Sequence, residues 1–257
     1  SGPREENAMP IFRRALLKTA NAGVVTFKDS NGVEEIQTPA REEIALLHVR
    51  WSAAADASLL HSLRPTLSTE ELRRADRFRV VPPRHCFILS WGILRQLLGS
   101  LTGKQPAAME FTFGPQGKPY LAGAMNPDCL QFNLSHSGED ILFAITRERE
   151  IGVDIEKARE RSRMERIAQR HYHPNEICDL KQLEEPAFVD RFYEYWTLKE
   201  AWIKALGHGL RYPISTLDFS RLLQSGGGRF HLENADWWCH PFELAPGMPA
   251  AMATKAR

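Results

Sequence analysis

Three charged side chains in the most aromatic part of the chain have types and spacing that could support chemistry. Lys199, Glu200 and Lys204 lie in the segment 192–210, FYEYWTLKEAWIKALGHGL. If this segment is helical, Glu200 and Lys204 are neighbours on one face, because they are four residues apart. A solvated ion pair on a buried helix is the commoner meaning of this spacing. The aromatic surroundings and a second acidic pair upstream favour a functional site instead.

The second acidic pair lies in the predicted strand 152–156, GVDIE. Side chains alternate along a strand, so Asp154 and Glu156 share one face while Val153 and Ile155 point into the core. Like charges held together are unfavourable unless a cation joins them, and Mg²⁺ binds one or two carboxylates together with water and phosphate oxygens. An edge strand with a solvated acidic face is an equally good reading of this motif alone.

Polar loops and an arginine cluster could bind an anion. The segment 133–138, NLSHSG, places a hydroxyl and an imidazole at an expected strand-to-turn corner. A Ser–His nucleophile pair is an alternative, but the GxSxG context of such an elbow is absent, and an ordinary structural turn is the commonest meaning. Gly117-Lys118-Pro119 offers one cation on a rigid loop. Arginines gather around one helix end, which is usually a solvated surface: Arg73, Arg74, Arg77, Arg79 and Arg84.

Hydrophobic periodicity predicts the elements that must position these side chains. The 192–206 helix should end at Gly207 or Gly209, which accept left-handed backbone. Further helices are expected at 68–78, at 84–101 and from Pro174. Strands are expected at 44–51, 111–113, 120–121, 130–134, 141–146, 151–155, 214–219, 230–232, 237–244 and 250–253, with a turn at 135–138. Helices followed by strands in each half predict an α+β fold and not regular βαβ winding.

Composition limits the class of protein. The chain has 257 residues, 43% hydrophobic and 25% charged, which is ordinary for a globular protein. A formal net charge of +1 argues against a nucleic-acid partner, and the apolar runs are too short for a membrane span. The four cysteines are scattered singly without a CxxC pair, which favours a reducing, cytoplasmic location over a disulfide or zinc scaffold.

The chain divides into four expected parts. Residues 1–8, before Met9, are expected to be a scar of cloning. Residues 9–43 are expected to be an N-terminal appendage of unknown role, with a short helix at 11–20 and a hairpin at 24–36. Residues 44–150 form the first α+β half. Residues 151–257 form the second half, which carries the acidic strand and the charged helix.

Four motifs, taken in order, resemble those of the 4′-phosphopantetheinyl transferases of the larger, Sfp-like type. They are FGPQGKPYL, FNLSHSG, IGVDIE and YWTLKEAWIKALGHGL. WTxKEAxxK with an upstream GVDIE is a highly specific pairing, and the match runs from about Ile44 to Ala253. The resemblance implies two similar α+β halves related by a pseudo-twofold axis, with the active site between them. We expect a monomer, because such a chain contains its own coenzyme A cleft.

The resemblance also implies the reaction. The 4′-phosphopantetheine arm of coenzyme A, the substrate, moves to a serine of an acyl or peptidyl carrier protein and releases adenosine 3′,5′-bisphosphate. Mg²⁺ is the expected cofactor, with Mn²⁺ as an alternative, and the carrier could serve fatty-acid, polyketide or nonribosomal peptide synthesis. Two alternatives stay open: a magnesium-dependent phosphohydrolase that uses the same acids, and a catalytically dead relative that holds carrier proteins or coenzyme A.

The resemblance carries roles to matching residues of this chain. The expected metal ligands are Asp154, Glu156 and Glu200, and the expected catalytic residues are Glu200 as the base, Lys204 and Asp154. The expected contacts with coenzyme A are Arg74, Gly117, Lys118, Asn133, Ser135, His136, Lys199 and Lys204, with Gly117 and Lys118 near the adenosine 3′-phosphate. Cys86 departs from the pattern, since many relatives have an arginine there, and Arg84 is the expected substitute.

The resemblance implies that the carrier partner presents acidic helices, so a local basic surface is expected. Arg159, Arg163, Arg166 and Arg170 are spaced by four, three and four residues, which aligns them on one face if the stretch is helical. A solvated arginine face beside Glu160 and Glu165 is the alternative.

Overall fold

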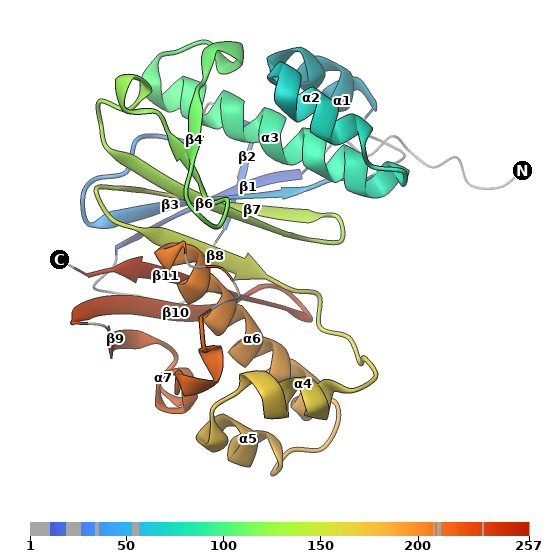
Figure 1. Cartoon of the computed structure of the whole chain (residues 1–257), viewed down its shortest axis with the longest axis vertical. Helices are drawn as coiled ribbons and strands as arrows, with labels where there is room; N and C mark the ends of the chain where they lie inside the picture. Colours follow the sequence, from blue (N-terminus) through green and yellow to red (C-terminus); the bar gives the residue numbers. More distant parts are fainter. Residues whose placement is uncertain are drawn as a thin grey trace, which may run out of the picture.

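The computed structural model describes residues 11–18, 27–33, 36–52, 57–207, 209, 212–232 and 234–256. The expected cloning scar and residues 24–26 and 34–35 of the expected hairpin lie outside these residues. Figure 1 shows two stacked halves, with helices on the outer sides and the sheets of both halves meeting in the middle. This arrangement confirms the α+β expectation. Among the described helices, none is long and apolar enough to cross a membrane.

The first half is a five-stranded antiparallel sheet with helices against one face. Its strands run in the order β2-β1-β3-β7-β6. They are β1 (Ile11–Lys18), β2 (Lys28–Ser30), β3 (Glu43–Arg50), β6 (Leu130–Ser137) and β7 (Asp140–Arg147). The helices are α1 (Ala57–Leu63), α2 (Thr69–Asp76) and α3 (Val81–Thr102), and β4 (Phe111–Phe113) pairs with β5 (Pro119–Leu121). The apolar residues of α3 and of the sheet form the core of this half.

Strand β1 corrects one expectation. Residues 11–20 were expected to be a short helix, but Ile11–Lys18 pairs with Glu43–Arg50 along its whole length. Pairing with a distant strand decides the conformation here, because strand preference depends strongly on tertiary context. The expected appendage therefore supplies two of the five strands of the first sheet.

The second half repeats the plan of one long helix on an antiparallel sheet. Its strands run in the order β8-β11-β10-β9. They are β8 (Ile151–Ile155), β9 (Gly228–Leu232), β10 (Ala235–Ala245) and β11 (Met248–Lys255). The helices are α4 (Met164–His171), α5 (Pro174–Leu180), α6 (Ala187–Leu206) and α7 (Ser220–Gln224). The expected strand at 214–219 is wrong: Ile214–Thr216 is a 3₁₀ turn, and Ile214 O accepts a hydrogen bond from Lys199 Nζ of α6.

The two sheets pack together through small and branched apolar side chains. The first sheet contributes Ala15, Ile44, Leu46, Leu142 and Ala144, and the second contributes Ile151, Val153, Ile155, Leu244, Met248, Ala250 and Met252. Val153 and Ile155 are 0% and 1% exposed, which confirms that this face of β8 is buried. The opposite face of β8, with Asp154, is therefore turned toward α6.

The edges of the two sheets meet along β6 and β8, and side chains replace a backbone ladder there. Asn133 Oδ1 accepts a hydrogen bond from Val153 N at 2.9 Å, and Ser137 Oγ accepts one from Lys157 N at 3.0 Å. Between them, Ser135 Oγ lies 3.4 Å from Ile155 N. These bonds satisfy edge N–H groups that would otherwise be unpaired. They also correct the expected turn at 135–138, because β6 continues to Ser137.

Candidate functional site

Helix α6 is placed directly on β8 by a glycine. A Cβ added at Gly152 would overlap backbone atoms of Ala201 and Ala205, so only glycine permits this close approach. The helix ends as expected at Gly207, whose φ of 71° is in the left-handed region and whose N–H bonds to Ile203 O. Asp154, two residues after Gly152, therefore lies close to the helix face that carries Lys204.

A charged cavity of about 370 Å³ lies between the halves, where β6, β8 and α6 meet. It is lined by Leu134, Ser135, His136, Asp154, Glu156, Trp196, Glu200 and Lys204. Lys204 Nζ is 2.6 Å from Asp154 Oδ1 and 3.0 Å from Ser135 Oγ, and Ser135 Oγ donates to Asp154 Oδ1 at 2.8 Å. The cavity thus gathers three carboxylates and one ammonium group, as the spacing of the two acidic motifs predicts.

Two acids of this cavity, Glu156 and Glu200, have a raised pKa. Burial, and then the charge of Asp154, raises the pKa of Glu200 to about 7. The same two causes, in the same order, raise the pKa of Glu156, although Ser137 donates to its Oε2 at 3.2 Å. A proton is thus held near neutral pH at a position where a general base could act.

These residues fit a divalent cation by donor type and charge. Asp154 Oδ2 is buried and has no hydrogen-bond partner within the described residues. Two further carboxylates line the same space, and a cation would relieve their mutual repulsion. Within the described part of the chain, no three His, Cys, Asp or Glu side chains are already gathered closely enough to form a metal centre. Lys204 neutralises Asp154 in this arrangement.

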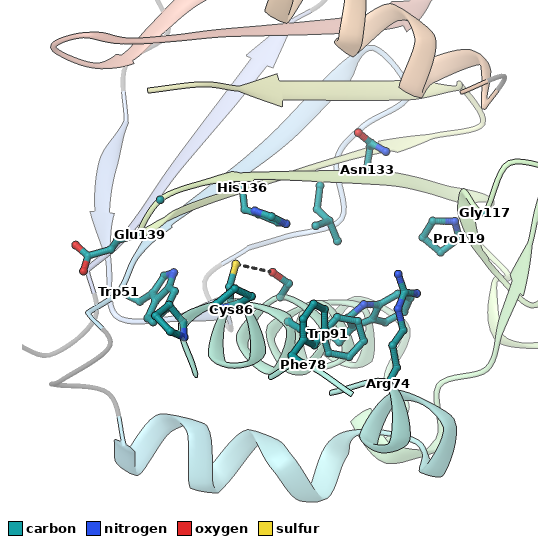
Figure 2. Close-up of a pocket in the computed structure, with 16 residues that line it drawn as sticks. Trp51, Arg74, Phe78, Cys86, Trp91, Gly117, Pro119, Asn133, His136 and Glu139 are labelled. Carbon is teal, nitrogen blue, oxygen red and sulfur yellow. Dashed lines mark hydrogen bonds between the residues drawn. The ribbon is translucent and has the colours of Figure 1, made fainter. Parts of the chain in front are cut away.

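A larger cavity of about 670 Å³ adjoins the charged one, and Leu134 and His136 line both. It lies between β6 and α3, and Figure 2 shows His136 pointing into it while Asn133 points to the other side of the strand. Aromatic and proline side chains form much of its wall: Trp51, Phe78, Pro82, Pro83, Phe87, Trp91 and Pro119. Such a wall suits a flat apolar group, and the adjoining charged cavity suits the phosphates of the same ligand.

The cation of the large cavity comes from Arg74 and not from Arg84. Arg74 lines the cavity, and its guanidinium lies 5.2 Å from the centre of the Phe87 ring. Arg84 lies in the first turn of α3 but is absent from the described lining of both cavities, so the expected substitution is not supported. Cys86 lines the large cavity, and burial raises the pKa of its thiol, which keeps this position neutral.

Lys199 is placed away from the cavities, contrary to expectation. Its side chain and that of Glu176 are both 0% exposed, and Lys199 Nζ is 2.8 Å from Glu176 Oε2. The same ammonium donates to Ile214 O at 3.0 Å and to Leu217 O at 2.7 Å. All three donors are therefore used inside the protein, so Lys199 joins α6 to α5 and to the loop before α7.

Lys118 is also absent from the cavities, although its neighbours Gly117 and Pro119 line the larger one. The residue is 8% exposed, and its Nζ donates to Ala205 O at 2.7 Å and to Ile151 O at 3.2 Å. A phosphate contact from this ammonium was expected, whereas the structure directs it to the second half of the chain.

The polar residues of β6 are divided between two tasks. Asn133 and Ser135 were expected to bind coenzyme A; they line one cavity each, but their side chains also bond to the β8 backbone. His136, the residue after Ser135, lines both cavities. Alternation along a strand explains the division.

Sequence reasoning missed Glu176 and several aromatic residues. Glu176 was not singled out, because carboxylates in the first turn of a helix are usually exposed. Trp51 and Trp91 carried no signal, because aromatic residues in apolar periodic segments usually belong to the core. Trp196 lies in the predicted 192–206 helix and was not singled out, yet it lines the charged cavity.

One family model and several known proteins are similar in sequence to this chain. The family model described as the 4′-phosphopantetheinyl transferase superfamily matches residues 150–246. The chain is 40% identical over 153 residues to the 4′-phosphopantetheinyl transferase HetI of Nostoc sp., covering 60% of this chain and 65% of that protein. It is 34% identical over 160 residues to a putative 4′-phosphopantetheinyl transferase of Synechocystis sp., covering 62% and 65%. A 4′-phosphopantetheinyl transferase of Bacillus subtilis is 33% identical over 161 residues, covering 63% and 68%. The match thus spans 65% of the length of each of the first two relatives.

Proposed function

The chain belongs to the 4′-phosphopantetheinyl transferase superfamily, and on that premise we propose that it transfers the 4′-phosphopantetheine arm of coenzyme A to a serine of an acyl or peptidyl carrier protein. Adenosine 3′,5′-bisphosphate is the second product. The observation that carries the proposal is the junction of two cavities at Leu134 and His136. One cavity has an aromatic wall that suits a nucleoside, and the other has the Lys204 ammonium and three carboxylates that would hold a divalent cation beside a pyrophosphate.

Glu200 is the proposed base for the serine hydroxyl of the carrier protein. Its pKa of about 7 suits proton transfer near neutral pH. The serine oxygen attacks the β-phosphorus of coenzyme A, and the bond from that phosphorus to the bridging oxygen breaks. Lys204 Nζ, already in the cavity, neutralises charge on the departing phosphate. His136, at the junction of the cavities, orients the substrate phosphates.

Asp154, Glu156 and Glu200 are the proposed ligands of Mg²⁺, or of Mn²⁺ in its place. When bound, the ion supplies positive charge to the phosphates and acidifies a nearby hydroxyl group. The unpartnered Asp154 Oδ2 and the raised pKa of Glu156 and Glu200 support this assignment.

The proposed carrier surface begins directly after Glu156. Residues 157–170 contain six basic and two acidic side chains, while the whole chain has a net charge of only +1. Arg159 and Arg163 precede α4, so the expected alignment of four arginines on one helical face is wrong. The charge nevertheless gathers beside the residues that line the reaction cavity, where it would attract an acidic carrier.

We also propose that the protein works as a monomer in the cytoplasm. One chain supplies every lining residue of both cavities, so a second copy is not needed to complete them. The four described cysteines are free, which fits a reducing compartment.

Intact-mass analysis of several apo-carriers after incubation with coenzyme A, Mg²⁺ and the protein tests the proposal. We expect the mass of the phosphopantetheine arm to be added to at least one carrier. The Asp154→Asn variant, which keeps the side-chain shape, should add none. Release of phosphate products in the absence of a carrier would instead indicate a phosphohydrolase, and coenzyme A binding without any turnover would indicate a catalytically dead relative.

A further inference from the structure

The loop before β5 sends alternate residues in different directions. Gly117 and Pro119 line the large cavity, whereas Lys118 between them is 8% exposed and directs its side chain to the second half. Its ammonium lies 5.6 Å from the centre of the Tyr120 ring, and burial lowers its pKa to about 8, so the charged form still predominates at pH 7. One short loop therefore touches both the substrate cavity and the catalytic helix.

Lys118 meets α6 at the helix end where carbonyl groups lack partners within the helix. Ala205 O is one of these carbonyls, and Lys118 Nζ donates to it at 2.7 Å. A cation at this end also interacts favourably with the helix dipole. The second acceptor, Ile151 O at 3.2 Å, lies at the start of β8. The ammonium thus fixes α6 and β8 to each other and both to the first half.

Close packing around this contact leaves little freedom of movement. A Cβ added at Gly207, just beyond the helix, would lie 3.2 Å from Tyr120 Oη and 3.3 Å from Lys118 Cδ. Lys204 is the residue before Ala205, and Lys204 and Glu200 both project from this helix into the charged cavity. A shift of the helix end would therefore move the two side chains that the proposed reaction requires.

We propose that Lys118 is a positioning residue that holds the carbonyl end of α6 against the 114–119 loop, and that it does not read the adenosine 3′-phosphate of coenzyme A. The proposal rests on the proposed transferase function. It assigns to Lys118 an effect on turnover, because a displacement of about 1 Å at a catalytic group can cost about 100-fold in rate.

Lys118→Met and Lys118→Gln separate the two roles, with Lys104→Met as a control that removes an exposed lysine of the same half. Kinetics are measured with coenzyme A and with dephospho-coenzyme A. We expect Lys118→Met to lower kcat about 10-fold or more for both substrates, with little change in KM, as for loss of an interaction that serves the transition state. The ratio of kcat/KM between the substrates should equal that of the wild type. Lys118→Gln keeps one amide donor for a carbonyl, so its kcat should fall less.

The proposal would be overturned if both variants kept kcat while kcat/KM became nearly equal for coenzyme A and dephospho-coenzyme A. That result would make Lys118 a phosphate ligand. Unchanged kinetics in both variants would overturn it as well. Should Lys118→Met fail to fold, Lys118→Gln still separates the roles, since it lacks the charge that a phosphate needs.

Hydrogen exchange tests the contact independently of turnover. In Lys118→Met, amides at 203–207 should exchange faster while those at 189–196 keep their protection; unchanged exchange at 203–207 would contradict the contact. If the wild type modifies no carrier, the proposed function fails, but this measurement still decides whether Lys118 holds the helix.

Discussion

Two lysine–carboxylate ion pairs lie on different sides of α6, and they differ in burial and in how completely their polar atoms are bonded. Lys199 and Glu176 are both 0% exposed, with 2.8 Å between the charged atoms, and backbone carbonyls take the remaining donors of Lys199. Lys204 and Asp154 are closer, at 2.6 Å, but the Lys204 side chain is 29% exposed. Asp154 Oδ2 has no hydrogen-bond partner within the described residues.

The difference separates a pair whose polar atoms are fully bonded inside the protein from a pair that borders a cavity. Every polar atom of the Lys199–Glu176 pair that can bond is occupied: Glu176 also accepts from His173 N at 2.9 Å and from Phe219 N at 2.9 Å. Such a pair has no capacity left for a substrate, and removing one partner leaves a buried charge. The Lys204–Asp154 pair borders a cavity and keeps capacity for a phosphate or a cation.

The largest effect should come from breaking the buried pair. We expect Lys199→Met to lower the free energy of unfolding by about 3–5 kcal/mol, because it leaves Glu176 buried without its cation. Urea denaturation measures this change. Combining Lys199→Met with Glu176→Leu should recover most of the loss, since an apolar pair of similar volume often replaces a buried ion pair. A stable Lys199→Met protein with weakened coenzyme A binding would show that Lys199 faces the substrate.

The matching change in the cavity pair should affect the rate of transfer more than the stability of the fold. We expect Lys204→Met to lower the rate of transfer about 100-fold, the usual effect of losing one charge-stabilising donor. Its urea midpoint should fall less than that of Lys199→Met, because Lys204 is partly exposed and Ser135 still donates a hydrogen bond to Asp154. Lys104→Met serves as the control for loss of a surface lysine. Equal destabilisation by Lys199→Met and Lys204→Met would remove the distinction between the pairs.

The raised pKa of Glu200 predicts that the stability of the fold depends on pH. The folded carboxyl binds its proton with a pKa of about 7, against 4.5 for the ordinary group. Between these values the folded state holds a proton that the unfolded state lacks, so this contribution to stability is present below pH 4.5 and lost as pH rises through 7. In metal-free protein, the free energy of unfolding measured with urea should thus fall as pH rises from 4.5 to 7 in the wild type. The Glu200→Gln variant should lack this part of the fall.

The same urea unfolding experiment is then repeated in the presence of Mg²⁺. A cation near Glu200 favours the charged carboxylate, so added Mg²⁺ should move the loss of stability to lower pH or abolish it. Glu200→Gln should show no such movement at that group. A wild-type profile that Mg²⁺ leaves unchanged would speak against Glu200 as a ligand.

The smallest effect should come from the basic segment 157–170, which lies outside both ion pairs. Arg163→Glu with Arg166→Glu should raise the KM for an acidic carrier several-fold and flatten its salt dependence, because exposed charges act mainly on encounter and are screened by salt. The KM for coenzyme A should not change. An unchanged carrier KM at low ionic strength would refute this surface, and an equal loss of coenzyme A affinity would place the arginines in the substrate cavity.

Local patterns predicted correctly the elements that carry the candidate site residues. The helix of Glu200 and Lys204, its end at Gly207, and the acidic strand with Asp154 all lie where periodicity places them. The capping box of Ser68 and Glu71 likewise opens α2. These features depend on the 3.6-residue period of a helix, on strand alternation and on residues whose backbone preferences act locally.

Only the tertiary structure decided which charged residues face the cavities. Lys199 and Lys204 are five residues apart, so a helix points them in different directions, but the sequence does not say which direction is buried. Packing on Gly152 turned Lys204 to the cavity, and α5 covered Lys199. The same holds for Lys118, which meets a carbonyl 87 residues away, and for β1, which became a strand by pairing with β3. Contacts between distant segments carry no local period, and for that reason the fold alone could assign these residues.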